Sequence, residues 1–115
     1  MATYCVTVPI LPGGVELMRK WNEENVVNNI DHDLVMKAAG ISQEQVWVQH
    51  LPQGDFAVAS CETNDTEKTI RVLSTSNEPW AIRFREHLKR AHGLNLLIGA
   101  PPLLNETAVD WREKY

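Results

Sequence analysis

Cysteine, long apolar runs and clusters of basic residues are all scarce or missing in this chain. Its two cysteines, Cys5 and Cys61, cannot form a dense disulfide framework, so we expect reduced thiols and a cytoplasmic location. No apolar run approaches the ~20 residues that span a bilayer, and the N-terminus lacks a secretory pattern, so we expect no membrane partner. The net charge is -4 and no basic run is present, so we expect no nucleic-acid partner.

The composition is that of an ordinary globular domain. Hydrophobic residues make up 43% of the 115 residues and charged residues 23%. A domain of this length buries roughly two thirds of the surface that its unfolded chain exposes, which is enough for a core without metals or disulfides. We expect one domain over residues 1–115, with an extended C-terminal tail from about residue 100.

Strand and helix patterns alternate along the chain. β-Rich runs predict four strands, at residues 2–10, 46–51, 55–61 and 94–98. Amphipathic periodicity predicts helices at residues 15–26, 31–39, 66–73 and 79–91. Asp31 is the expected N-cap of the second helix, Asn64 or Asp65 caps the third, and Gly93 ends the fourth. This order predicts an α+β, ferredoxin-like βαββαβ fold with a four-stranded antiparallel sheet and helices on one face.

The hairpin between the second and third strands assigns the two faces of this sheet. A three-residue loop, Pro52 to Gly54, would pair Leu51 with Asp55. The richer apolar face would then lie toward the helices, with Tyr4, Val6, Val8, Val46, Val48, His50, Phe56, Val58 and Ser60. The other face would hold small or uncharged side chains, namely Thr3, Cys5, Thr7, Trp47, Gln49, Ala57, Ala59 and Cys61.

An uncharged sheet face is unusual in contact with water, so something should cover it. We expect a second copy of the chain to pack there, as a homodimer through the sheet face that forms a dimeric α/β barrel. The alternative is that the proline-containing C-terminal tail folds back over the same face.

Several segments carry a resemblance to a known group of proteins. They are residues 46–56 (VWVQHLPQGDF), Glu62, residues 76–80 (SNEPW), residues 101–104 (PPLL) and Asp110-Trp111. The chain resembles, on these segments, small uncharacterised bacterial proteins of the dimeric α/β barrel, ferredoxin-like superfamily. The wider superfamily includes cofactor-independent monooxygenases, haem-degrading enzymes and stress-responsive barrel proteins, with pockets between sheet and helices. The resemblance supports the fold, and no catalytic residue is carried over from it.

Two histidines are candidates for a site over the sheet. His50 is predicted on the helix-facing side of its strand, and His87 follows Arg83 by one helical turn. Together with Tyr4 and Trp80 they would bind an aromatic or carbonyl ligand, or His50 or His87 would act as a base with Tyr4 as hydrogen-bond donor. The predicted ligand-binding set is Tyr4, His50, Trp80, Arg83 and His87. The alternative is a core histidine and a surface histidine that never meet.

Tryptophan offers a further clue to ligand binding. Trp21 and Trp80 each lie on the apolar stripe of a predicted helix, where packing into the core is the usual role. Two indoles that lined one cavity would also stack on a flat ligand.

Other motifs give no metal or cofactor site. The run Asp31-His32-Asp33 splays around a helix, and His87 and His92 miss the i, i+4 spacing of paired metal ligands. Gly13-Gly14 lacks the remainder of a phosphate-binding loop. Cys5 and Cys61 would lie on neighbouring strands, where they form either a redox pair or buried inert thiols. The sequence therefore predicts no cofactor and no metal.

Three functional hypotheses follow from the sequence. The first is binding of a small apolar or aromatic molecule in a pocket between sheet and helices. The second is an enzyme of the cofactor-independent monooxygenase or isomerase type with a histidine base. The third is an interaction module without a ligand. An open pocket beside the histidines would favour the first two, and a filled one the third.

Overall fold

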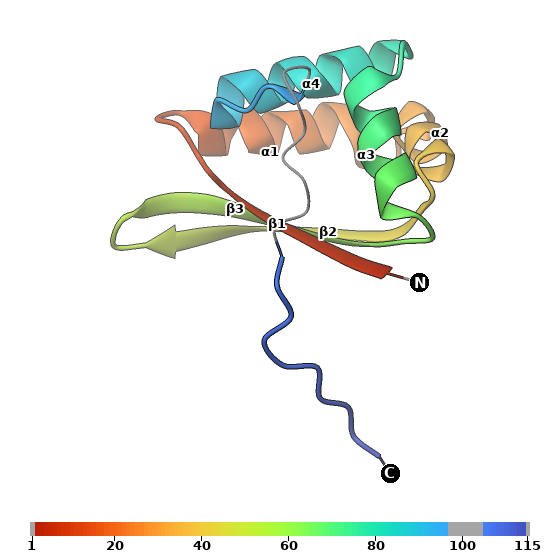
Figure 1. Cartoon of the computed structure of the whole chain (residues 1–115). Coiled ribbons are helices and arrows are strands. Elements are labelled where there is room, and N and C mark those ends of the chain that lie inside the picture. Colours follow the sequence, from red (N-terminus) through yellow and green to blue (C-terminus); the bar gives the residue numbers. More distant parts are fainter. Residues whose placement is uncertain (1, 97–104, 115) are drawn as a thin grey trace.

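A computed structural model describes residues 2–96 and 105–114, which fold into two layers (Figure 1). The elements of this part of the chain are β1 Ala2–Pro9, α1 Gly14–Asn25, α2 Ile30–Ala38, β2 Ile41–Leu51, β3 Gly54–Thr63, α3 Thr66–Thr75 and α4 Pro79–His92. The strands form one antiparallel sheet in the order β1-β3-β2, and the helices lie over one of its faces. The fold class α+β is therefore confirmed.

The predicted four-stranded ferredoxin-like sheet is wrong, because the described part of the chain contributes three strands. Helix α4 ends at Gly93, whose positive φ of 68° begins a tight closing turn. The amide of Leu94 then donates to the carbonyl of Leu88 at 3.2 Å, so the chain is still closing the helix where a strand was expected. Residues 94–96 form no strand, and residues 97–98 lie outside the described residues. The dimeric α/β barrel, which requires that fourth strand, is not supported either.

The predicted register of the β2–β3 hairpin is wrong by one residue. Leu51 pairs with Gly54 rather than Asp55, because Gly54, with φ of 139°, is the first residue of β3 and not the last of the loop. A one-residue shift turns every side chain of a strand to the opposite face. Side chains on the helix-facing side of β3 are therefore Ala57, Ala59 and Cys61, and those on its open side are Phe56, Val58 and Ser60.

The faces predicted for β1 and β2 are confirmed. Val8 of β1 and Val48 of β2 both pack with Met18 of α1, on the side that the helices cover. The opposite face, called the open face below, carries Trp47, whose surface is 48% exposed. The larger apolar side chains of β3 therefore lie on the open face beside it, and its apolar character is stronger than the sequence suggested.

The helices begin and end close to the predicted positions. Asn29 rather than Asp31 caps α2, since its side-chain oxygen accepts the amide of His32 at 3.1 Å. Asp65 caps α3 as predicted, accepting the amide of Lys68 at 3.1 Å.

The buried residues form two clusters between the layers. The first contains Val35, Met36, Trp80 and Ala81, with Trp21, Ile41, Leu73 and Phe84 packed against it. The second contains Met18, Ala57 and Ala91, with Val8, Ile10, Leu17 and Val48 packed against it. Backbone contact between α1 and α4 beside the second cluster is close, and a Cβ atom on Gly14 would lie 2.8 Å from the carbonyl oxygen of Ala91. Glycine is therefore required at that crossing.

A buried hydroxyl pair joins α3 to the rest of the fold. The hydroxyls of Thr63 and Thr69 lie 2.6 Å apart, and that of Thr69 also donates to the carbonyl of Ala39 at 2.7 Å. Both side chains are almost fully buried, so these hydrogen bonds replace all contact with water.

The described part of the C-terminal tail runs away from the domain (Figure 1). Residues 105–114 are exposed, and Trp111 keeps 76% of its surface accessible. The Asn105 side chain donates to the carbonyl of Cys5 at 2.6 Å, beside β1. Residues 105–114 do not cover the open face, and Pro101 and Pro102 of the same tail lie outside the described residues. Within residues 2–96 and 105–114, none of the helices has the length and apolar character to cross a membrane.

Candidate functional site

A cavity of about 360 Å³ lies between the helices and the covered face of the sheet. Its walls come from α1, α2, α4 and the two strands β2 and β3; they are Met18, Trp21, Asn22, Val26, Val27, His32, Glu44, Val46, Ala57, Ala59, Trp80, Phe84, His87, Leu88 and His92. Members of both core clusters are among them, so the cavity occupies the space between the clusters.

Small side chains on the middle strand leave this space open. Ala57 and Ala59 point from β3 toward the helices and form the floor of the cavity. Under the register predicted from the sequence, Phe56 and Val58 would have taken their place and filled much of the volume. The one-residue difference in the hairpin therefore creates the cavity.

Three aromatic rings form the opposite wall. Trp80 and Phe84 stack with centroids 5.2 Å apart and planes at 12°, and Trp21 packs against Trp80 at 5.5 Å. The indole nitrogen of Trp80 donates to the backbone carbonyl of Asn25 at 2.8 Å, which fixes the orientation of a ring that is only 2% exposed. The wall is therefore apolar, with the Trp80 ring held by a hydrogen bond, as expected for a surface that holds a flat molecule.

The polar side chains of the cavity are three imidazoles, the carboxylate of Glu44 and the amide of Asn22. His92 Nδ1 lies 2.9 Å from the carbonyl of Pro9, so Nδ1 carries a proton and donates it to that oxygen. The ring of His32 lies between two carboxylates, with Nδ1 2.9 Å from Asp33 and Nε2 3.3 Å from Glu44. The ring of His32 also meets Trp80 edge-on at 5.4 Å.

His87 is neutral at pH 7. Its burial, reinforced by the neighbouring His92 and Arg90, lowers the pKa from its ordinary value of 6.5 to about 4. The ring stacks on Trp21 with centroids 4.8 Å apart and planes at 9°, and it meets the ring of His92 edge-on at 5.9 Å. No hydrogen bond joins His87 to another residue within 2–96 and 105–114, so its ring is held there by packing, including the contacts with the rings of Trp21 and His92.

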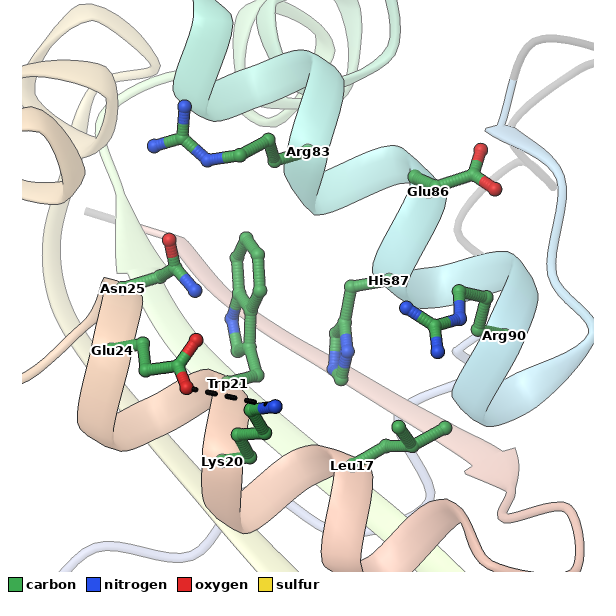
Figure 2. A pocket seen from close by; sticks show the side chains of 9 residues that line it. All are labelled: Leu17, Lys20, Trp21, Glu24, Asn25, Arg83, Glu86, His87 and Arg90. Atoms are coloured by element: carbon green, nitrogen blue, oxygen red, sulfur yellow. Dashed lines mark ion pairs between the residues drawn. The ribbon is translucent and has the colours of Figure 1, made fainter.

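A second hollow, of about 300 Å³, lies between α1 and α4 on the outside of the helical layer (Figure 2). We call this hollow the outer groove. It is lined by Leu17, Lys20, Trp21, Glu24, Asn25, Arg83, Glu86, His87 and Arg90. Trp21 and His87 belong to both hollows, so their stacked rings form the wall between the outer groove and the cavity.

The structure divides the predicted site residues into two groups. Trp80 and His87 line the cavity, and Arg83 lines the outer groove beside His87. Tyr4 and His50 line neither hollow. His50 is exposed near the end of the hairpin, where Nδ1 lies 2.7 Å from the carboxylate of Asp55 on the next strand. The predicted cluster of Tyr4, His50, Trp80 and His87 is therefore not the one that lines the cavity.

Sequence reasoning missed other residues of the site. It paired Trp21 with Trp80 as indoles that could line one cavity, and the structure confirms that both do. It left Phe84 out of the predicted ligand-binding set, and it weighed His32 and His92 only as metal ligands. His32 reaches the cavity from α2, and Phe84 and His92 reach it from α4, so no spacing along the sequence relates His32 to the other two.

The redox pair of Cys5 and Cys61 is not formed. Cys61 pairs with Tyr4, and Cys5 pairs with Ser60 one position along, so the two thiols point to opposite faces of the sheet. Burial, together with the charge of Glu44 and the nearby Cys5, raises the pKa of the Cys61 thiol to about 11. Burial and the two cysteines also raise the pKa of Tyr4. Cys61 is therefore a protonated, unreactive thiol at neutral pH.

Residues 2–96 and 105–114 contain no group of three histidine, cysteine or acidic residues arranged to hold a metal ion. Comparisons with known protein families, curated proteins and solved structures found no match. The resemblance to the dimeric α/β barrel superfamily stays a prediction, and the cavity and the outer groove are the basis of the function proposed below.

Proposed function

We propose that the protein binds a small, flat, largely apolar molecule in the cavity between the sheet and the helices. The observation that carries this proposal is the opposition of an aromatic wall, Trp21, Trp80 and Phe84, to a floor of two alanines across about 360 Å³. Cavities of roughly 300 Å³ and above, apolar with a few oriented polar groups, are typical ligand sites.

The imidazoles would orient such a ligand. The Nε2 atom of His92 is the ring nitrogen left to meet the ligand, because Nδ1 donates to Pro9, and in the neutral ring Nε2 is an acceptor. Glu44, on the β2 side of the cavity, adds a carboxylate acceptor. A hydroxyl or N–H group on the ligand would therefore donate to the protein, and a bare hydrocarbon would leave these acceptors unused.

The enzyme hypothesis, a cofactor-independent monooxygenase or isomerase, is less well supported. General-base catalysis works best when the pKa of the base lies near the working pH. The lowered pKa of His87 makes it a weak base at neutral pH, and His50 and Tyr4 lie outside both hollows. A purely structural interaction module would have no use for the cavity.

We further propose that a second copy of the chain covers the open face, forming a homodimer. Support comes from the apolar side chains that meet there, with Trp47 and Leu51 of β2 exposed beside Phe56 and Val58 of β3. The two unpaired thiols fit the reducing cytoplasm, which we propose as the location.

Binding can be tested with N-phenyl-1-naphthylamine, a neutral aromatic probe whose fluorescence rises in apolar surroundings. We expect saturable binding of one probe per chain, accompanied by quenching of tryptophan emission through Trp21 and Trp80. Ala59→Phe places a ring inside the cavity and should weaken the probe's affinity by about tenfold or more, a loss of at least ~1.4 kcal/mol.

The matched control is Ile82→Phe, which adds a ring on the exposed outer side of α4. It should leave the affinity unchanged. No saturable binding to the unmodified protein, or equal affinity for the Ala59→Phe variant and the unmodified protein, would contradict the proposed function.

A further inference from the structure

The outer groove and the cavity meet at one thin wall. The stacked rings of Trp21 and His87 line both hollows, and the remaining walls of the two are largely different. His87 has no hydrogen bond to hold its ring within the described residues, so rotation of the ring costs only the stacking on Trp21 and the edge contact with His92. The Trp21–His87 pair is therefore the part of the wall that a molecule occupying both hollows would have to displace.

The rim of the outer groove carries more positive than negative charge. Lys20, Arg83 and Arg90 line it, against Glu24 and Glu86. Glu24 is engaged with Lys20, at 3.9 Å across one turn of α1. In the described ranges, no carboxylate forms an ion pair with Arg83 or Arg90.

Figure 2 shows how these side chains are directed. The ammonium of Lys20 and the guanidinium of Arg90 extend toward the gap beside the His87 ring, and the guanidinium of Arg83 lies above the Trp21 ring. The carboxylate of Glu86 points away from the gap. Lys20 from α1 and Arg90 from α4 thus flank the Trp21–His87 wall, and the Glu24 carboxylate, paired with Lys20, lies beside Trp21 in this view.

We propose that the outer groove is the mouth of the cavity and that the ligand is an amphipathic anion, with its apolar body inside and its acid group held by Lys20, Arg83 and Arg90. This inference rests on the proposed function and adds the chemical class of the ligand. The acid group is a carboxylate, sulfonate or phosphate, since guanidinium and ammonium groups bind all three.

The division of the ligand follows from the cost of burying charge. An ionised acid group inside the apolar cavity would lose its hydration without a cation to replace it. In the outer groove the same group stays partly solvated and meets charge-assisted donors, of which an arginine can offer two in parallel to one acid group. The apolar body is stabilised inside the cavity, because its surface is buried away from water there, and it would stay exposed to water in the groove. Each half of the ligand therefore has one place where it is stable.

The test compares two probes that share one aromatic body. N-Phenyl-1-naphthylamine is neutral, and 8-anilino-1-naphthalenesulfonate differs from it by one sulfonate group. We expect the sulfonate probe to bind about tenfold or more tightly at about 0.1 M salt and to lose that advantage at about 1 M, where the screening length falls from about 10 to about 3 Å. This measurement needs no variant, so it does not depend on how any substitution folds.

A double variant locates the effect. Lys20→Gln with Arg90→Gln should weaken the sulfonate probe by about tenfold and leave the neutral probe unchanged. The control is Arg71→Gln with Lys89→Gln, which removes the same charge from exposed positions that line neither hollow. It should leave both affinities as they are.

The outcomes separate the two proposals. Failure of the neutral probe to bind overturns the proposed function itself. Binding of the neutral probe with no preference for the sulfonate, or equal loss of the sulfonate probe in the test and control pairs, overturns the assignment of the groove and leaves the cavity proposal standing.

Discussion

Replacing Ala59 by isoleucine should stabilise the protein, because the added atoms enter a cavity instead of a filled core. Ala59 lies on the covered face of the middle strand and forms part of the cavity floor. Isoleucine suits a strand position, since its branched side chain packs well on a pleated surface. The substitution thus adds buried surface at a position whose backbone conformation isoleucine adopts readily.

The magnitude follows from the atoms added. Three carbon atoms at about 0.8 kcal/mol each give at most about 2.4 kcal/mol. Ordering the new side chain costs about 0.5–1 kcal/mol, which leaves an expected gain of about 1.5 kcal/mol in the free energy of unfolding. A close-packed site would respond with the opposite sign, because extra carbon atoms forced into a filled core cost about 1–3 kcal/mol.

Urea unfolding followed by tryptophan fluorescence measures this free energy, and Ala81→Leu is the matched comparison. Ala81 is fully buried in the cluster around Trp80 and does not line the cavity, so the same three carbons should destabilise the protein there. Loss of stability in both variants would refute the reasoning, because it would mean that the space above Ala59 is filled in solution.

Three further predictions follow from other parts of the fold. Trp47→Asp places a charge on the open face, and we expect sedimentation to show monomers where the unmodified protein forms dimers; a dimer that survives would refute the homodimer. Thr69→Val keeps the shape of a buried side chain and removes its hydroxyl, which should cost about 1–3 kcal/mol in urea unfolding, whereas Thr69→Ser, which keeps the hydroxyl, should lose less of its hydrogen bonding with Thr63. Because the pKa of His87 is lowered from 6.5 to about 4 by folding, the unfolded chain binds a proton at this ring more readily than the folded protein in that pH range. The free energy of unfolding should therefore have its full contribution from the neutral ring above pH 6.5 and lose it as the pH falls toward 4. His87→Phe should flatten that part of the pH–stability curve, while His50→Phe, on an exposed ring, should not; equal slopes for the His87 variant and the unmodified protein would contradict the burial argument.

The sequence by itself determined the local structure of this protein. The helix caps and the turn at Gly93 depend on hydrogen bonds between residues a few positions apart, and so they follow from short motifs such as Asp65 before Thr66. Alternate side chains along a strand point to opposite faces of a sheet. The more apolar alternate set in β1 and β2 therefore indicated which of their side chains face the helices. Even at this level the signal has limits, since Asn29 took the cap that the sequence assigned to Asp31.

Only the tertiary structure decided where the cavity lies and what lines it. The face of β3 depends on whether Gly54 ends the loop or begins the strand, a choice of one residue that exchanges Phe56 and Val58 for Ala57 and Ala59. The stacking of Trp21 on His87 depends on how α1 and α4 cross, and no spacing within either helix encodes that contact. Side chains brought together from distant parts of the chain are selected by packing, and packing is settled only when all the layers are in place.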